Sequence, residues 1–313
     1  MRLGRDDFGL VLSGGGAKGA YQAGAWATLC ELGIAERVRA ISGTSIGAIN
    51  GAAFAAVRDP ARIESFWMER VGSVVTMKPQ GLFSKNALLE WATDAASAFA
   101  QGKGFPFPGA LDRTGLERAL KGLLPQHWPD DSPAVYATAL ESIGGPWPAG
   151  QLQRRVFRIE AERDPDRRLR MILASAAIPF GLDPVEIDGA SFVDGGWEAQ
   201  GGDNTPAGPI LENHPDIRTL VVVHLNAAAT GGESWRRPTR RPALLGGIRY
   251  VEIRPSEPLP GPFDETAKLL DARDDAAPIA QFLRRAGGVF AFNRTAAAQS
   301  FSLGRTDALR ALT

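Results

Sequence analysis

Two glycine-rich loops, each lying between a strand-like and a helix-like segment, constrain the fold of this chain most strongly. Residues 8–12 form a short apolar run that stops at the first loop, residues 13–19. Residues 38–42 form a second run that stops at the second loop, residues 43–47. A helix-forming stretch follows each loop, so two βα units fill about the first sixty residues, a pattern typical of a parallel sheet. Both loops should then lie at the one sheet edge where open α/β sheets bind ligands.

The rest of the chain adds elements that fit the same sheet. Further strands are expected at residues 135–140, 155–160, 185–187, 190–193, 220–225 and 249–253, and further helices at residues 63–71, 86–100 and 168–177. Between the third and fourth of these strands stand Asp188 and Gly189, and an Asp-Gly pair between apolar arms favours a type I′ hairpin turn. The pattern predicts an α/β fold.

Composition and charge exclude several classes of function. The 313 residues carry 35 basic and 35 acidic side chains, so there is no net positive field to attract nucleic acid. Cys30 is the only cysteine, which excludes intramolecular disulfides and cysteine-rich zinc sites. The three histidines are scattered and no cluster has metal-ligand spacing, so neither a metal nor another cofactor is expected.

The distribution of apolar residues bears on location. No uninterrupted apolar stretch reaches the roughly 18 residues that a membrane-spanning helix needs, and the N-terminus shows no apolar signal core. We therefore expect a soluble, cytoplasmic protein. Peripheral contact with a membrane stays open, as does secretion without an N-terminal signal.

The second glycine-rich loop carries a candidate nucleophile, because Gly43-Thr-Ser45-Ile-Gly47 is a G-x-S-x-G between a strand and a helix. In that context the serine occupies a sharp, strained turn that exposes its hydroxyl above the sheet edge. The flanking glycines avoid collisions with neighbouring chain. The alternative is a serine that only caps a helix in a glycine-rich turn.

The first loop offers backbone N–H groups at the start of a helix, and so an anion cradle, through Gly14, Gly15, Gly16, Lys18 and Gly19. It also matches the G-x-G-x-x-G dinucleotide fingerprint, but the second strand does not end in the acidic residue which that site requires. A P-loop fails because glycine, not serine or threonine, follows the lysine. An oxyanion hole fits better, and nucleotide binding stays the less favoured alternative.

A serine nucleophile needs a base, and the sequence leaves two candidates. Asp194 begins Asp194-Gly195-Gly196 at the end of the second strand of the predicted hairpin, where a carboxylate desolvated enough to have a raised pKa could reach Ser45. His224 follows the serine in α/β-hydrolase order, so a triad stays open. An isolated Asp-Gly-Gly is otherwise simply a turn.

Four segments together resemble the patatin-like phospholipase family, in the family's order between residues 8 and 206: residues 13–19, 43–47, 174–180 (Ala-Ser-Ala-Ala-Ile-Pro-Phe) and 194–196. The resemblance implies a three-layer α/β/α fold with a mostly parallel central sheet, and a Ser-Asp dyad in place of a triad. By matching position, it implies that Ser45 is the nucleophile and Asp194 its activating partner. The implied oxyanion donors and supporting motif residues are Gly14, Gly15 and Gly16, and Lys18, Gly19, Gly43, Gly47, Gly195 and Gly196.

The resemblance also implies a substrate class, namely lipid acyl esters, with glycerophospholipids first, cleaved as by a phospholipase A or lysophospholipase through an acyl-serine. We expect one domain over residues 1–313, in which residues 207–313 complete the sheet and add C-terminal helices. The alternatives are a thioesterase or an esterase of other substrates, and a catalytically silent lipid-binding module.

The chain departs from the family pattern at two places. Residues 197–203 precede Asn204-Thr-Pro, where similar proteins reach Asn-x-Pro sooner, and this longer loop is expected at the mouth of the site. Lys18 stands where arginine is frequent, which keeps the charge but loses bidentate geometry. Neither departure removes a catalytic group.

Aromatic residues are candidates for an acyl channel or a membrane-facing rim, with ordinary packing as the alternative. They are Trp67, Phe83, Phe105 and Phe107. Trp235, beside the basic cluster at residues 236–241, is a candidate for contact with anionic lipid headgroups.

Overall fold

The computed structural model describes most of the chain: residues 7–70, 76–77, 111–145, 147, 150–179, 181–226, 247–259 and 294–313. Several predictions fall outside these residues. They are the helix at residues 86–100, the aromatic residues Phe83, Phe105 and Phe107, and Trp235 with the basic cluster at residues 236–241.

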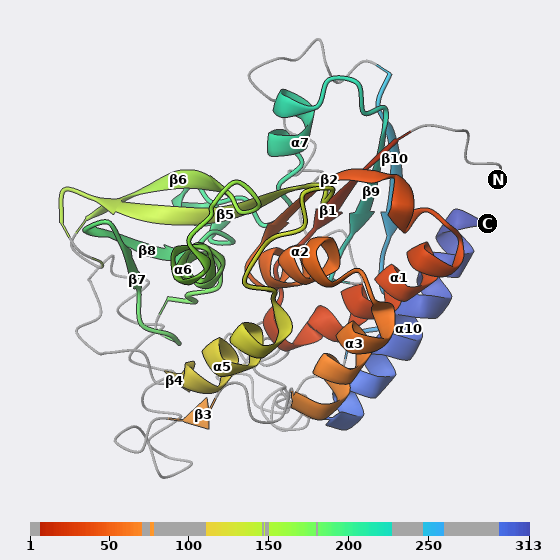
Figure 1. Ribbon diagram of the computed structural model, residues 1–313, viewed down its shortest axis with the longest axis horizontal. Helices are drawn as coiled ribbons and strands as arrows, with labels where there is room; N and C mark the ends of the chain where they lie inside the picture. Colours follow the sequence, from red (N-terminus) through yellow and green to blue (C-terminus); the bar gives the residue numbers. More distant parts are fainter. Residues whose placement is uncertain are drawn as a thin grey trace, which may run out of the picture.

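A mostly parallel sheet lies at the centre of the molecule (Figure 1), in the order β10-β9-β1-β2-β5-β8-β7, with β6 paired to β5. Its strands are β1 (Phe8–Leu12), β2 (Val38–Thr44), β5 (Ala134–Ile143), β6 (Gln151–Arg158), β7 (Val185–Ile187), β8 (Ala190–Asp194), β9 (Thr219–Val223) and β10 (Arg249–Ile253). The first five strands in the order run parallel, whereas β6, β7 and β8 are antiparallel to their partners. A small separate sheet pairs β3 (Thr76–Met77) with β4 (Leu111–Asp112). The predicted α/β class with a mostly parallel sheet is confirmed.

Helices pack on both faces of this sheet. They are α1 (Gly19–Glu31), α2 (Ile46–Val57), α3 (Pro60–Ser65), α5 (Thr114–Leu123), α6 (Pro165–Ser175), α7 (Gly208–Asn213) and α10 (Arg294–Leu312). In Figure 1, α7 lies on one side of the sheet, and α1, α2, α3 and α10 lie on the other. Strand β1 shows why both faces of the sheet are covered, because successive side chains of a strand point to opposite faces. Leu10 and Leu12 join the core around α1 and α2, whereas Val11 packs in the second core with Ile210 and Leu211 of α7.

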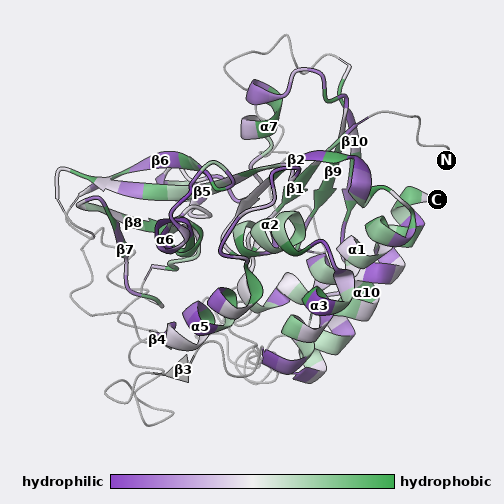
Figure 2. Cartoon of the chain, in the orientation of Figure 1, coloured by the Kyte–Doolittle hydropathy of each residue, from purple (hydrophilic) through white to green (hydrophobic). Residues whose placement is uncertain are grey.

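Hydropathy follows these layers. Figure 2 shows hydrophobic residues along α2 and β9, which lie in the interior, and hydrophilic residues on α6. All five residues of β9 are buried, as expected for a central strand of a parallel sheet that is covered on both faces.

Local predictions are largely confirmed, with two corrections. Asp188 and Gly189 have φ angles of 52° and 81°, as a type I′ turn requires. The helix predicted over residues 63–71 is present but begins earlier and is not α-helical throughout, because α3 ends at Ser65 and a π-helical turn, Phe66–Arg70, continues it. Helix α5 has no counterpart in the prediction. Trp67 is 1% exposed and belongs to the core rather than to a rim.

Helices α1 and α10 approach each other so closely that glycine is required at the contact. A Cβ on Gly24 of α1 would lie 2.0 Å from the Phe301 carbonyl oxygen, and one on Gly304 of α10 would lie 2.1 Å from the Tyr21 carbonyl oxygen. The Tyr21 hydroxyl also donates to Asp307 Oδ2 at 3.1 Å. The C-terminal helix is therefore held to α1 by direct backbone packing.

Gly24→Ala is expected to destabilise the protein by about 3 kcal/mol, the upper part of the range for overpacking a core, because the obstructing atoms are backbone. Urea unfolding measures this. The matched control is Gly122→Ala in α5, where an added Cβ meets nothing within 4 Å. That variant should gain up to about 1 kcal/mol from helix propensity. Equal stability of the two variants would contradict the close packing.

Candidate active site

Strands β2 and β8 end head to head on one edge of β5. Thr44, the last residue of β2, pairs with Thr138, and Asp194, the last residue of β8, pairs with Ala139. Strand β6 pairs with β5 alongside both of these ladders. Because a strand has only two edges, β6 occupies one edge, and β2 and β8 share the other. Ser45, directly after β2, is thereby brought to the end of β8.

Ser45 occupies the strained elbow that the sequence predicts. Its φ of 58° and ψ of −125° lie in a region that costs a non-glycine residue about 1–3 kcal/mol. Close approach explains the glycines on either side. A Cβ on Gly43 would lie 2.3 Å from the Gly47 carbonyl group, and one on Gly47 would lie 2.3 Å from the Leu12 carbonyl oxygen.

Asp194 lies beside this serine in a buried environment. Its side chain is 6% exposed, and burial raises the pKa of its carboxyl to about 6, although interactions with the Ser45 hydroxyl and the Gly196 N–H lower that pKa. Oδ1 accepts the Gly196 N–H at 2.7 Å, while buried Oδ2 accepts no hydrogen bond from any residue that the structure describes. Near neutral pH this carboxyl therefore has both the pKa and an oxygen that a general base needs.

The first glycine-rich loop packs directly on Ser45. A Cβ on Gly14 would lie 3.2 Å from Ser45 Cβ. The Gly14 N–H donates to the Asn204 carbonyl at 3.0 Å, so it is engaged within the protein. Across the described ranges, the N–H groups of Gly15 and Gly16 donate to no backbone carbonyl. Of the three expected oxyanion donors, Gly14 therefore differs from Gly15 and Gly16 in that its N–H already donates to a backbone carbonyl.

A buried polar network holds both ends of that loop. Gln22 Nε2 donates to the Ser13 carbonyl at 2.7 Å, and Asn50 Nδ2 donates to the Gly19 carbonyl at 2.9 Å. Asn50 also donates to Gln22 Oε1 at 2.9 Å and accepts from Trp67 Nε1 at 3.1 Å. These amide side chains were not singled out in the sequence, because only the fold brings them to the loop.

Lys18 and Gly19 complete the loop. Lys18 is half-buried and ends a 3₁₀ turn, Gly16–Lys18, with its N–H 3.3 Å from the Gly15 carbonyl. A Cβ on Gly19 would lie 2.4 Å from Ile46 Cγ1, so this glycine permits α1 to begin against the elbow.

Hydrogen bonds hold the end of the longer loop, residues 197–203, against the base of the site. The Asp203 N–H donates to the Gly195 carbonyl at 2.8 Å, and the Thr44 hydroxyl donates to the Asp203 carbonyl at 2.6 Å. The added residues therefore bulge out, and Asn204 returns to the glycine-rich loop. Gly195 and Gly196 are needed for close approach, since their Cβ atoms would lie 2.1 Å from the Thr138 carbonyl oxygen and 2.7 Å from Asn204 Oδ1.

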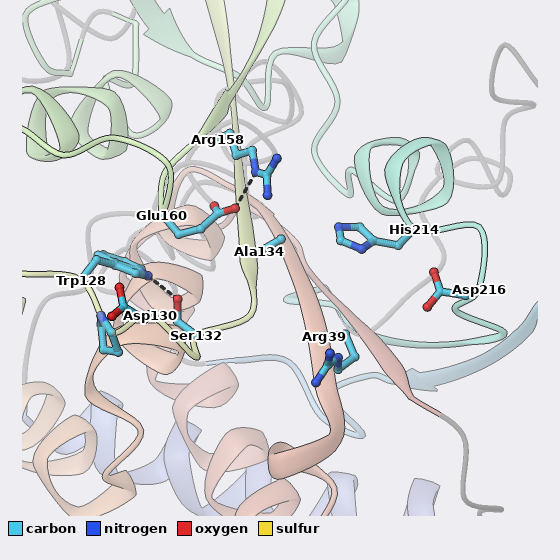
Figure 3. A pocket seen from close by; sticks show the side chains of 10 residues that line it. Arg39, Trp128, Asp130, Ser132, Ala134, Arg158, Glu160, His214 and Asp216 are labelled. Carbon is cyan, nitrogen blue, oxygen red and sulfur yellow. Dashed lines mark hydrogen bonds and ion pairs between the residues drawn. The ribbon is translucent and has the colours of Figure 1, made fainter.

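His224 and His214 contact side chains other than Ser45 and Asp194. His224 follows β9, which β1 separates from β2, and its Nε2 is 3.4 Å from Glu252 Oε2. His214 Nε2 lies 3.0 Å from the Tyr136 hydroxyl and lines a polar pocket of about 420 Å³ (Figure 3). Arg39, near the start of β2, also lines this pocket, so the pocket lies at the opposite sheet edge from Ser45. It forms no part of the candidate active site.

No group of three His, Cys, Asp or Glu side chains in the described part of the chain is arranged to hold a metal ion. None of the helices described is both long and apolar enough to cross a membrane.

Comparison with known proteins finds one family and several distant structures. Residues 10–211 match the family model described as patatin-like phospholipase, a region that contains all four motif segments. No curated protein sequence matches. Similar solved structures include VipD from Legionella pneumophila, with 16% identity and a TM-score of 0.43 over 98% of this chain and 67% of that one.

Two further structures are similar at this distant level. ExoU from Pseudomonas aeruginosa, solved in complex with SpcU, has 16% identity and a TM-score of 0.35 over 97% of this chain and 52% of that one. Human GIVD cytosolic phospholipase A2, in complex with methyl gamma-linolenyl fluorophosphonate, has 12% identity and a TM-score of 0.38 over 98% and 59%. This chain thus spans about half to two thirds of the length of the three proteins.

Proposed function

The chain belongs to the patatin-like phospholipase family, and from this premise we propose that it hydrolyses lipid acyl esters through a dyad of Ser45 and Asp194. One observation carries the proposal. A buried carboxyl whose pKa burial raises to about 6 lies beside a serine in a strained strand-to-helix turn. Acyl transfer by a serine uses this arrangement, in which a group with a perturbed pKa lies next to the hydroxyl that it activates.

In the proposed acylation step, Asp194 Oδ2 takes the proton of the Ser45 hydroxyl as the serine oxygen attacks the ester carbonyl. The N–H groups of Gly15 and Gly16 donate to the oxyanion that forms. The C–O bond to the alcohol then breaks, and Asp194 returns the proton to the departing alcohol. In deacylation Asp194 takes a proton from water, the water oxygen attacks the acyl-serine, and the proton returns to Ser45.

Several features lower the barrier without a histidine. Burial shifts the carboxyl pKa from 3.8 to about 6, which makes it a stronger base than an ordinary aspartate. The N-terminus of α2, directly behind Ser45, favours developing negative charge. Each oxyanion donor is worth about 100- to 1,000-fold in rate.

The substrate class follows from the family. Members are lipid acyl hydrolases, so glycerophospholipids and their lysophospholipid products are the first substrates to test, and thioesters are the nearest alternative. Hydrolysis of lipids in a bilayer also requires contact with the membrane surface, which we propose as peripheral. The loop at residues 197–203 lies beside the dyad and is the described segment best placed to affect substrate preference.

A fluorophosphonate probe tests the nucleophile. The wild-type protein is expected to form a covalent adduct on Ser45, located by peptide mass spectrometry, and to hydrolyse both a short-chain nitrophenyl ester and phosphatidylcholine vesicles. Ser45→Ala should lose both the adduct and turnover, because no oxygen remains to form the acyl-enzyme. The matched control is Ser302→Ala, which removes an exposed hydroxyl on α10 and should change neither.

Three outcomes would contradict parts of the assignment. Turnover that survives in Ser45→Ala at the original rate rejects the nucleophile. Loss of turnover in His224→Gln, with Asp194→Asn nearly unaffected, would favour a histidine triad instead. An adduct with no hydrolysis of any lipid ester would favour a thioesterase or an esterase of other substrates.

A further inference from the structure

Ser175, the last residue of α6, lies at the junction of β2 and β8 but has no role in the mechanism above. Its side chain is fully buried. The hydroxyl donates to the Thr138 carbonyl at 2.5 Å and accepts the backbone N–H of Ser45 at 3.0 Å. One hydroxyl therefore joins the strand shared by both ladders to the backbone of the proposed nucleophile.

The pairing of the strands explains why the Ser45 N–H needs the Ser175 hydroxyl as a partner. Thr138 is the last residue of β5 that pairs with β2, and the next residue, Ala139, pairs with the end of β8. Ser45 lies just beyond the last paired residue of β2, so its N–H has no strand to donate to. A buried N–H needs a partner, and the Ser175 hydroxyl supplies it.

The same segment also holds the other member of the dyad. The Asp194 N–H donates to the Ala177 carbonyl at 2.8 Å, two residues after Ser175. Residues 175–177 therefore bind the backbone of both Ser45 and Asp194. A hydroxyl that donates a hydrogen bond is polarised and becomes a better acceptor. The hydrogen bond from Ser175 to Thr138 therefore strengthens the one that Ser175 accepts from Ser45, and both lie in a buried environment.

We propose that Ser175 is a positioning residue for the reaction, which fixes the strained backbone of Ser45 so that its hydroxyl faces Asp194. This inference rests on the proposed role of Ser45 as nucleophile. Without the Ser175 hydroxyl, the Ser45 N–H loses its anchor and the elbow can relax from its φ of 58°. A displacement of about 1 Å at a reacting group costs on the order of 100-fold in rate.

Ser175→Ala tests the proposal. We expect kcat for a nitrophenyl ester and the rate at which a fluorophosphonate labels Ser45 to fall together, by about 10- to 100-fold. KM should stay unchanged, as should the acid limb of the pH profile, which Asp194 sets. Rates are expressed per site titrated by the fluorophosphonate, so a merely structural loss of folded protein does not lower them. The matched control is Ser191→Ala, which removes a buried hydroxyl of β8 that has no partner in the described part of the chain.

Ser175→Cys keeps the test decisive if the alanine variant does not fold. Its thiol preserves the buried group but forms only weak hydrogen bonds, so kcat should fall between those of wild type and Ser175→Ala. Wild-type kcat and labelling rate in either variant would overturn the proposal, as would an equal fall in Ser191→Ala. Failure of the proposed function looks different, because the wild-type protein would then carry no label on Ser45, and the positioning role would be rejected with it.

Discussion

Asp194→Asn is expected to lower kcat for ester hydrolysis by about 10⁴-fold, the upper end of what a general base contributes. The amide keeps the shape of the side chain, and its oxygen can still accept the Gly196 N–H that Asp194 Oδ1 accepts at 2.7 Å. It cannot take a proton from Ser45, however. In the wild-type protein, kcat should fall as the pH drops through about 6, because the raised pKa of Asp194 puts protonation there.

The same substitution should make the folded protein more stable at pH 8. The pKa of the Asp194 carboxyl is raised from 3.8 to about 6 on folding, so folding favours its protonated form. Its contribution to stability is therefore complete below pH 3.8 and is lost as the pH rises through 6. At pH 8 the ionised wild-type carboxylate then costs about 2–3 kcal/mol, at 1.36 kcal/mol per pKa unit, a cost that a neutral amide avoids.

Urea unfolding at pH 8 and pH 4.5, with kcat measured on the same samples, checks both effects. The stability gain of Asp194→Asn should be large at pH 8 and small at pH 4.5. Asp216→Asn, which changes an exposed aspartate at the opposite sheet edge, should alter neither stability nor kcat. A variant that is inactive but shows the same stability difference at both pH values would argue that Asp194 is not desolvated.

Much of the fold could be predicted because its signals are local. The strands at residues 8–12 and 249–253 have the predicted bounds. The turn at Asp188 and Gly189 has the predicted type, because aspartate and glycine both tolerate the positive φ that this turn requires. Helix α5 was missed although its buried residues have the i, i+3, i+4 and i+7 spacing of a helix, namely Leu116, Ala119, Leu120 and Leu123.

The site was predictable only in part. Glycine spacing identifies Ser45, because a sharp turn between strand and helix needs those glycines locally. Two long-range facts were not accessible. The sequence does not show that β2 and β8 share one edge of β5, nor that the Gly14 N–H is engaged by Asn204. Ser175 stood within a recognised motif, but its role depends on contacts with residues 37 and 130 positions away.

Gly47→Ala should disrupt the elbow from the side that faces β1. A Cβ there would lie 2.3 Å from the Leu12 carbonyl oxygen and 2.9 Å from the Ser13 carbonyl oxygen, and both obstacles are backbone. Because backbone cannot rotate away as a side chain can, we expect a loss of about 3 kcal/mol in stability. The start of α2 would move away from the glycine-rich loop, and with it Ser45 from the proposed oxyanion donors, which should lower kcat on the order of 100-fold.

Gly51→Ala, four residues along the same helix, separates this steric effect from helix propensity. Its added Cβ would meet the methyl carbon Ile41 Cγ2 at 3.0 Å, which can yield because it ends a side chain. The gain from replacing a helical glycine, up to about 1 kcal/mol, offsets that contact. Urea unfolding and kcat for a nitrophenyl ester should therefore leave Gly51→Ala near wild type and place Gly47→Ala far below it. Both glycines lie in α2, but only at Gly47 would an added Cβ press on the backbone at the end of β1. Similar losses in the two variants would therefore assign the effect to the helix itself and remove the argument that backbone contact with β1 sets the position of Ser45.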